Sequence, residues 1–335
     1  IPNLPDWKHG TNLPYLKEIC DYWIKDFDWS LYEKKINDFQ NFKTHVDGIN
    51  IHFIKEEGSG SNPKNLLLIH GWPGSVIEFI EIINRLAHPE NYGGNKEDGV
   101  TVIAPSLPGF GFSGSPNEPY GPRKIAEILN KMMTINLKYK SYVAQGGDWG
   151  ATIANWLGYD HDKYCKAIHI NCLTMRHPDG PQTDKEKKWQ EKFDKDQIMQ
   201  DGYRTQQATK PQTLSYAMMD SPVGIAAWII EKMHGWSDLK DGNIESVYSR
   251  DVLLANIMTY LCTDTFSTST WIYFGRREEG GRLFPKDFKK INIPTGIAVF
   301  PKEMSEWPPR GHFASLEKPD LLVDDTLSFF KKIKI

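Results

Sequence analysis

The sequence has few cysteines, no long apolar run and almost no excess of charge. Its four cysteines, Cys20, Cys165, Cys172 and Cys262, show neither close pairing nor metal-ligand spacing, so we expect free thiols in a reducing compartment. No apolar segment approaches the length of a membrane span, and no signal-peptide pattern is present. A net charge of −3 gives no reason to expect a nucleic-acid partner.

Apolar, strand-like segments alternate with helical segments over much of the chain. Strands are expected at 66–69, 101–104, 141–144, 167–171 and 295–300, after a hairpin over 42–54 that turns at Asp47-Gly48. Helices are expected near 75–88, 122–138, 150–160 and 320–332. Because strands that alternate with helices pair in parallel, the pattern predicts a mainly parallel α/β sheet.

The order of these segments divides the chain into three parts. Residues 1–42, rich in tryptophan and charge, are expected to form a helical extension outside the core. Residues 43–173 and 289–335 form the expected α/β core, and residues 174–288 are expected to contain helices only. A helical insertion between strands predicts a lid with the binding site beneath it.

One five-residue motif indicates a nucleophile. Residues 146–150, Gly-Gly-Asp-Trp-Gly, follow an apolar strand and precede a helix, which is the setting of a nucleophile elbow. A carboxylate nucleophile attacks an alkyl carbon and forms an ester with it, so Asp148 predicts epoxides or alkyl halides as substrates. The alternative is that Asp148 only caps the following helix, since aspartate is a preferred capping residue.

A second motif follows the strand at 66–69. Residues 70–75, His-Gly-Trp-Pro-Gly-Ser, predict a sharp turn whose backbone N–H groups face a developing oxyanion, and the Trp72–Pro73 bond is a candidate cis peptide. His70 is expected to orient this loop. Ser75 is expected to cap the next helix, with Glu78 as its partner in a capping box.

A late histidine and a preceding glutamate fit the remaining roles. His312 lies in a loop before the last amphipathic helix, where the chain order nucleophile, acid, histidine places a general base. The acid candidate is Glu303, just after the strand at 295–300. Each has a simpler alternative: a loop histidine bonded to backbone, and a solvated loop glutamate.

The glycine-rich stretch at 109–114 matches the dinucleotide pattern G-x-G-x-x-G. We reject that interpretation because Pro116 and Pro119 prevent a helix from opening there. The stretch is instead expected to be a loop that packs near the site.

Residues 70–75, 146–150, 300–303 and 311–313 together resemble the microsomal-type epoxide hydrolases, and among them the insect juvenile hormone epoxide hydrolases. The resemblance covers nearly the whole chain and implies an α/β-hydrolase fold with a helical lid. It also implies two lid tyrosines that hold the epoxide oxygen, and Tyr203 and Tyr273 lie in the segments that match. It further implies a membrane anchor upstream of this chain, at the endoplasmic reticulum, with the catalytic domain in the cytosol.

These residues predict an epoxide hydrolysis in two steps without a metal or organic cofactor. Asp148 attacks a small apolar epoxide, such as a terpenoid like juvenile hormone, while Tyr203 and Tyr273 donate to the ring oxygen. His312, oriented by Glu303, then activates a water that releases the diol.

Backbone N–H groups of Trp72 and Trp149 are expected to hold the oxyanion of the second step. Two alternatives remain open. One is a haloalkane-type dehalogenase that uses the same Asp148 nucleophile with indole N–H donors around the halide. The other is a catalytically dead lipid-hormone binder.

The spacing between residues 300 and 312 is unusually short. A parallel neighbour of the strand at 295–300 requires a crossover of a dozen or more residues before it delivers His312. Pro301, Pro308 and Pro309 would interrupt either a helix or a strand in between. We therefore predict that residues are missing here, with a break between Met304 and Gly311.

Overall fold

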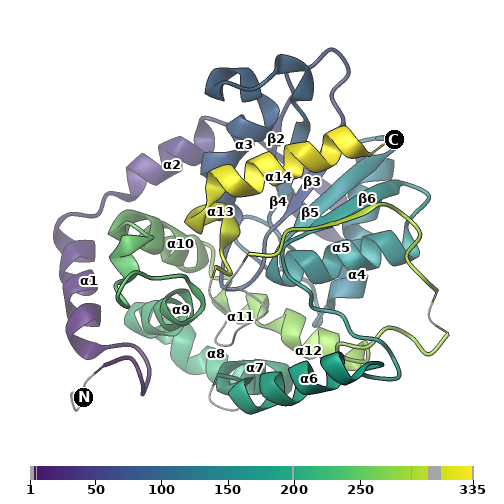
Figure 1. The fold of residues 1–335 in the computed structure, drawn as a ribbon. Coiled ribbons are helices and arrows are strands. Elements are labelled where there is room, and N and C mark those ends of the chain that lie inside the picture. Colours follow the sequence, from purple (N-terminus) through teal and green to yellow (C-terminus); the bar gives the residue numbers. More distant parts are fainter. Residues whose placement is uncertain (1–3, 5, 198–199, 288, 301–310, 334–335) are drawn as a thin grey trace.

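The computed structural model describes residues 4, 6–197, 200–287, 289–300 and 311–333, without the side chains of residues 196 and 197. A central sheet carries helices on both faces (Figure 1). In the described part of the chain the sheet has seven strands in the order β1-β2-β4-β3-β5-β6-β7. They are β1 (Gln40–Val46), β2 (Ile49–Glu56), β3 (Asn65–Ile69), β4 (Thr101–Pro105), β5 (Tyr142–Gly146), β6 (Cys165–Ile170) and β7 (Thr295–Ile297).

Parallel pairing dominates the sheet, as the sequence predicts. β1 and β2 form the expected hairpin at Asp47-Gly48, and β2 pairs antiparallel with β4, whereas every later neighbour pairs in parallel. β7 is shorter than predicted and ends at Ile297. Its partner β6 ends at Ile170, which accepts a last hydrogen bond from the Ala298 N–H (2.9 Å), so no ladder partner remains for the following residues.

Alternate residues of each strand face opposite layers of helices. The layers contain η1 (Val76–Phe79), α3 (Ile80–Ala87) and α14 (Pro319–Lys332) on one face, and α4 (Pro122–Lys131), the π-helical turn Met132–Asn136 and α5 (Asp148–Asp160) on the other. In β3, Leu66 and Leu68 pack into the first layer, and Leu67 and Ile69 pack into the second. Burial on both faces explains why such strands are continuous apolar runs.

The segment between β6 and β7 contains helices and no strand of the sheet within its described residues, as predicted. Its helices are α6 (Asp184–Gln197), α7 (Gly202–Thr209), α8 (Pro211–Asp220), α9 (Pro222–Trp236), η5 (Ile244–Ser246), α10 (Arg250–Cys262), α11 (Phe266–Ser269) and α12 (Trp271–Glu278). Figure 1 shows them gathered to one side of the sheet. The N-terminal helices α1 (Leu13–Lys25) and α2 (Trp29–Asn37) pack against α10.

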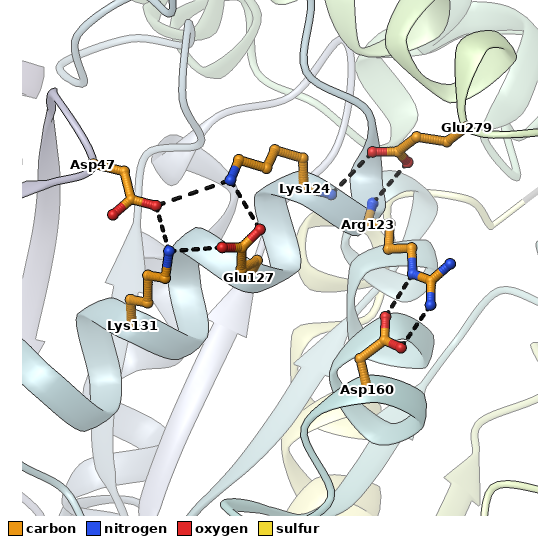
Figure 2. A network of polar contacts seen from close by, with 7 residues as sticks. All are labelled: Asp47, Arg123, Lys124, Glu127, Lys131, Asp160 and Glu279. Atoms are coloured by element: carbon orange, nitrogen blue, oxygen red, sulfur yellow. Dashed lines mark hydrogen bonds and ion pairs between the residues drawn. The ribbon is translucent and has the colours of Figure 1, made fainter.

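A carboxylate at the end of α12 caps the first turn of α4. Gly121 precedes α4 and has no side chain to accept from its free N–H groups. Glu279 accepts hydrogen bonds from the backbone N–H of Arg123 (2.9 Å) and of Lys124 (3.0 Å) instead (Figure 2). A Cβ at position 121 would lie 2.3 Å from the Glu279 carboxyl carbon, so the glycine is required for this contact. The contact joins the helix that carries Tyr273 to the core.

The rest of this network lies at the surface. Arg123 pairs with Asp160 at the end of α5 (2.7 Å), and Lys131 pairs with Asp47 in the hairpin turn (2.6 Å), as Figure 2 shows. Exposed pairs of this kind each contribute about 0.2–1 kcal/mol. The backbone cap by Glu279 is therefore the contact that positions α12, and the ion pairs add modest support.

Candidate active site

Asp148 occupies the predicted strand–turn–helix as the first residue of α5, just after β5 ends at Gly146. Its backbone adopts a φ of 45°, a conformation that is strained for a residue other than glycine and typical of a nucleophile elbow. The turn is tight enough that added Cβ atoms would collide: at position 150 with the Ile69 carbonyl oxygen (2.0 Å), and at position 71 with Asp148 Oδ1 (2.3 Å). These glycines therefore allow Asp148 to lie against the loop after β3.

The loop after β3 holds one carboxylate oxygen of Asp148. The backbone N–H of Trp72 donates to Asp148 Oδ1 (2.8 Å), and the Trp72–Pro73 peptide is cis, as expected. His70 supports the loop, with Nδ1 bonded to the Gly71 carbonyl (3.0 Å) and Nε2 accepting from the Leu107 N–H (3.1 Å). Burial lowers the pKa of His70 to about 4, so the ring is neutral and serves to orient the loop.

The capping box predicted at this loop is only half correct. Ser75 Oγ does accept from the N–H of Ile77 (3.3 Å), and it also donates to Asn256 Oδ1 (2.8 Å). The Glu78 carboxylate accepts no hydrogen bond from the Ser75 backbone N–H in the described structure. Its Oε2 accepts from Ser315 Oγ (3.4 Å), because the short 3₁₀ turn directs this carboxyl toward the site rather than back along the helix.

His312 lies beside Asp148. Its Nε2 is 3.5 Å from Asp148 Oδ2. The preceding Gly311 has a φ of 85°, which turns the chain inward, and the His312 N–H donates to the Trp236 carbonyl (3.2 Å). The Trp236 and His312 rings meet edge to face, with centroids 5.1 Å apart. The end of α9 thus positions this histidine.

A second carboxylate fixes the turn that follows His312. Glu317, in α13 (Ala314–Glu317), accepts from the N–H of Phe313 (2.9 Å) and of Asp238 (2.7 Å). Burial raises the pKa of Glu317, and these two hydrogen bonds and His312 oppose that rise. Glu317 therefore ties the histidine segment to the chain after α9.

Residues 301–310 lie outside the described residues. The predicted acid Glu303 and the predicted break between Met304 and Gly311 both fall there. β7 is the last strand of the sheet in the described residues, and His312 reaches Asp148 all the same.

Tyr203 in α7 and Tyr273 in α12 lie next to each other. Their rings pack edge to face with centroids 5.7 Å apart, and both contact the Trp72 indole. Burial raises the pKa of both phenols, and the charge of Asp148 raises each further. Both hydroxyls therefore stay protonated at neutral pH.

Indoles form the remaining walls. Trp72 stacks on Tyr203 (centroids 5.4 Å apart), Trp149 contacts Tyr273 edge to face (4.7 Å), and Trp236 contacts Tyr203 (5.2 Å). The indole nitrogens of Trp72, Trp149 and Trp236 are buried without a hydrogen-bond partner in the described structure. The site therefore has an apolar lining with several unpaired donors.

Glu78 is a site residue that the sequence interpretation missed. It lines a cavity of about 20 Å³ together with Asp148 and His312. Burial raises the pKa of Glu78 from 4.5 to about 8; the charge of Asp148 adds to the rise, and His312 opposes it. No signal in the sequence separates this role from helix capping, because the spacing Ser-x-x-Glu fits both.

Comparison with known proteins gives a consistent family. The family described as "Epoxide hydrolase N terminus" matches residues 2–79, and that described as "alpha/beta hydrolase fold" matches residues 64–218. Epoxide hydrolase 1 of Oryctolagus cuniculus is 35% identical, over 96% of this chain and 80% of its own length. Juvenile hormone epoxide hydrolase 1 of Ctenocephalides felis is 32% identical, over 98% and 79%.

Solved structures agree. The crystal structure of juvenile hormone epoxide hydrolase from Bombyx mori superposes with a TM-score of 0.85 at 27% identity, covering 99% of this chain and 88% of that one. The alignment with the rabbit protein runs over 367 residues, more than the 335 of this chain, so that relative has internal residues that this chain lacks.

The sheet order, the strained turn after β5 and the helices over it define an enzyme with the α/β-hydrolase fold. Its relatives define the chemistry more closely. The chain belongs to the epoxide hydrolases of the microsomal type, which are hydrolases of ether bonds. No disulfide joins the four cysteines in the described structure. No helix in the described part of the chain has the length and apolarity needed to cross a bilayer.

Proposed function

We propose that this chain opens apolar epoxides to diols through an ester formed on Asp148. The observation that carries the proposal is one carboxylate and two phenols on opposite sides of one site. Asp148 comes from the core, whereas Tyr203 and Tyr273 come from α7 and α12, and the pKa of both phenols responds to Asp148.

The first step is the attack of Asp148 Oδ2 on a ring carbon. Oδ1 already accepts the Trp72 N–H, which leaves Oδ2 for the substrate. As the new C–O bond forms, the ring C–O bond breaks and its electron pair moves to the ring oxygen. Tyr203 and Tyr273 donate to that oxygen, and such acid assistance contributes about 10²–10⁴-fold.

The second step is the hydrolysis of the ester. His312 takes a proton from a water that attacks the carboxyl carbon of Asp148, with Glu303 as the proposed acid partner of His312. The negative charge develops on Oδ1, which keeps the Trp72 N–H, and we assign the Trp149 N–H as the second donor because it follows the nucleophile. One donor of this kind contributes about 3 kcal/mol. The diol then leaves.

Glu78 is proposed to take part in this second step. The cavity of about 20 Å³ that it shares with Asp148 and His312 has room for one water, since a water requires about 10–15 Å³. The ionised Glu78 would accept a hydrogen bond from that water and stabilise the imidazolium form of His312. Its raised pKa places the ionisation near the working pH range of a general acid or base.

Glu78→Gln is expected to remove one ionisation from the pH profile. In the native enzyme, ester hydrolysis should accelerate as the pH rises through about 8, where Glu78 ionises. The Gln variant should accumulate the ester and lack this dependence, as stopped-flow tryptophan fluorescence would measure. Glu81→Gln, an exposed change in the following helix α3, is the control.

The same substitution is also expected to raise the stability of the folded protein. The folded-state pKa of Glu78 is raised, so its contribution to folding is complete below pH 4.5 and is lost as the pH rises toward about 8. The Gln variant should therefore gain stability over the native chain across this window, by up to about 1.4 kcal/mol for each unit of pKa difference. An unchanged pH profile for both hydrolysis and stability would refute the role of Glu78.

The substrate is proposed to be a terpenoid epoxide of the juvenile hormone type. Indoles and phenols line the site, and such walls bind extended apolar chains. The names of the flea and silkworm relatives support this class. By resemblance to epoxide hydrolase 1 we also propose that the enzyme works at the endoplasmic reticulum membrane.

A dehalogenase remains the second candidate because of the unpaired indole nitrogens of Trp72 and Trp149 beside the nucleophile. The two phenols, whose pKa the charge of Asp148 raises, favour epoxide hydrolysis over dehalogenation. A halide leaves without a proton donor, whereas an epoxide oxygen requires one. A dead lipid-hormone binder is disfavoured because the Trp72 N–H is already placed on the carboxylate.

A product assay separates the three. We expect a terpenoid epoxide to give the diol, and the corresponding terpenoid bromide to release bromide far more slowly. Faster bromide release would favour the dehalogenase. Tight binding of the epoxide without any diol would favour the carrier.

A further inference from the structure

Three arginines converge on a second cavity, away from the catalytic carboxylate. The cavity of about 230 Å³ lies among α6, α7 and the chain after α12, and it is lined by Arg176, Gln190, Phe193, Asp194, Asp201, Arg204 and Arg282. An isolated β-bridge between Arg176 and Leu283 brings the two ends of the helical segment together here, with the Arg176 N–H donating to the Arg282 carbonyl (2.8 Å).

The cationic groups of this cavity are poorly compensated. Arg282 forms no ion pair in the described structure, and its Nε is buried without a hydrogen-bond partner. The Arg176 side chain donates to the carbonyls of Leu173 (2.9 Å) and Met175 (3.1 Å). Arg204 forms an ion pair with Asp201. A buried guanidinium without a counter-charge is costly, so the arrangement calls for an anion.

A fourth arginine lies close behind this cavity. Arg276 donates to the carbonyls of Gly281 (3.2 Å) and Thr174 (3.2 Å) and to no carboxylate in the described structure. Burial, and then the charges of Arg282 and Arg204, lower its pKa to about 9. The pKa of Arg282 is likewise lowered to about 10, by burial and then by Arg204 and Arg176. The guanidinium groups thus repel one another.

The carboxylates of the cavity do not neutralise it. Asp201 is engaged by Arg204, and Asp194 accepts from Gln190 Nε2 (2.6 Å). The three lining arginines against these two carboxylates leave one positive charge, and Arg276 adds a second nearby. Phe193 supplies one apolar wall, with the Arg282 guanidinium 5.5 Å from its ring centroid.

We propose that this cavity is a binding site for a small oxyanion, a carboxylate or phosphate group held by Arg176, Arg204 and Arg282. Guanidinium groups match the two oxygens of such an anion with parallel hydrogen bonds. The volume accepts the anion together with a short organic chain against Phe193.

The site is also coupled to the active site, an extension that rests on the proposed function. Burial raises the pKa of Tyr203, whereas the charges of Arg204 and Arg282 oppose the rise. A bound anion cancels part of that positive field. Tyr203 then donates less readily to the ring oxygen, and ring opening slows.

Binding is tested on the whole chain by titration calorimetry and thermal unfolding. Sodium phosphate and sodium butyrate are the probes, each at constant ionic strength made up with sodium chloride. We expect saturable binding and a rise in Tm, and the probe that binds more tightly identifies the preferred group. Arg282→Gln should weaken binding at least 10-fold, as expected when a charge-assisted pair is lost. Arg277→Gln, an exposed change of equal charge on α12, should bind as the native chain does.

Equal responses to chloride, or undiminished binding in Arg282→Gln, would overturn the site. If that variant does not fold, Arg282→Lys keeps the charge but loses the planar fork, and it should bind more weakly than the native chain. The activity arm is separate: phosphate or butyrate should slow ester formation in the native enzyme and not in the variant. Binding without slowing leaves the site in place and refutes only its coupling to Tyr203.

Discussion

Asp148→Asn is expected to abolish turnover while substrate binding persists. A neutral amide cannot displace the ring oxygen, so we expect the rate to fall by on the order of 10⁴-fold or more, as for other nucleophile deletions. Binding should remain because the aromatic walls are untouched. Rapid-quench product analysis and equilibrium binding of a terpenoid epoxide measure the two effects. Asp160→Asn, at the far end of α5, changes the charge equally and should leave turnover intact.

The covalent step has an independent test in the native enzyme. A single turnover in heavy-oxygen water should place the label in the Asp148 carboxylate, because water attacks the ester carbonyl and not the substrate carbon. Mass spectrometry of the peptide that contains residues 141–160 would detect it. Label found only in the diol after one turnover would show direct attack by water, and the ester mechanism would be wrong.

The double substitution Tyr203→Phe and Tyr273→Phe is expected to slow ester formation by on the order of 10³-fold, within the range of acid catalysis. Each single change should cost far less, since the remaining hydroxyl still donates to the ring oxygen. Ester hydrolysis should change little, because the phenols act on the first step. Pre-steady-state tryptophan fluorescence separates the two rates.

The control for this pair is Tyr216→Phe, which alters a tyrosine of the same helical segment that is 73% exposed. It should match the native enzyme in both steps. A double variant that keeps its rate of ester formation, while near-ultraviolet circular dichroism shows a native fold, would remove Tyr203 and Tyr273 from the mechanism.

Short-range patterns in the sequence located the strand–turn–helix that holds Asp148. The placement of Asp148 depends on residues within a few positions of it, because an apolar strand, a tight glycine turn and a helix start together create the elbow. The same holds for Trp72, whose N–H is presented by its own loop. The mainly parallel sheet was equally predictable. The apolar pattern of each strand and the residues that end it lie within one short segment of the sequence.

Resemblance, and not periodicity, selected Tyr203 and Tyr273 from the other tyrosines. Nothing within their own helices distinguishes them, because what matters is that α7 and α12 face Asp148 across the site. For His312, both the local sequence and the tertiary structure contribute. Its position in a late loop suggested a base, whereas its place 3.5 Å from Asp148 depends on contacts with Trp236 and Glu317.

Only the tertiary structure shows what surrounds Glu78 and the arginines. Ser-x-x-Glu has the same local spacing whether the glutamate caps a helix or faces His312, and the contact with Ser315, more than 200 positions away, depends on the tertiary fold. Arg176 and Arg282 likewise meet only because the two ends of the helical segment come together. Local sequence determines backbone turns and apolar faces, whereas burial and the charges of distant neighbours determine what a polar side chain does.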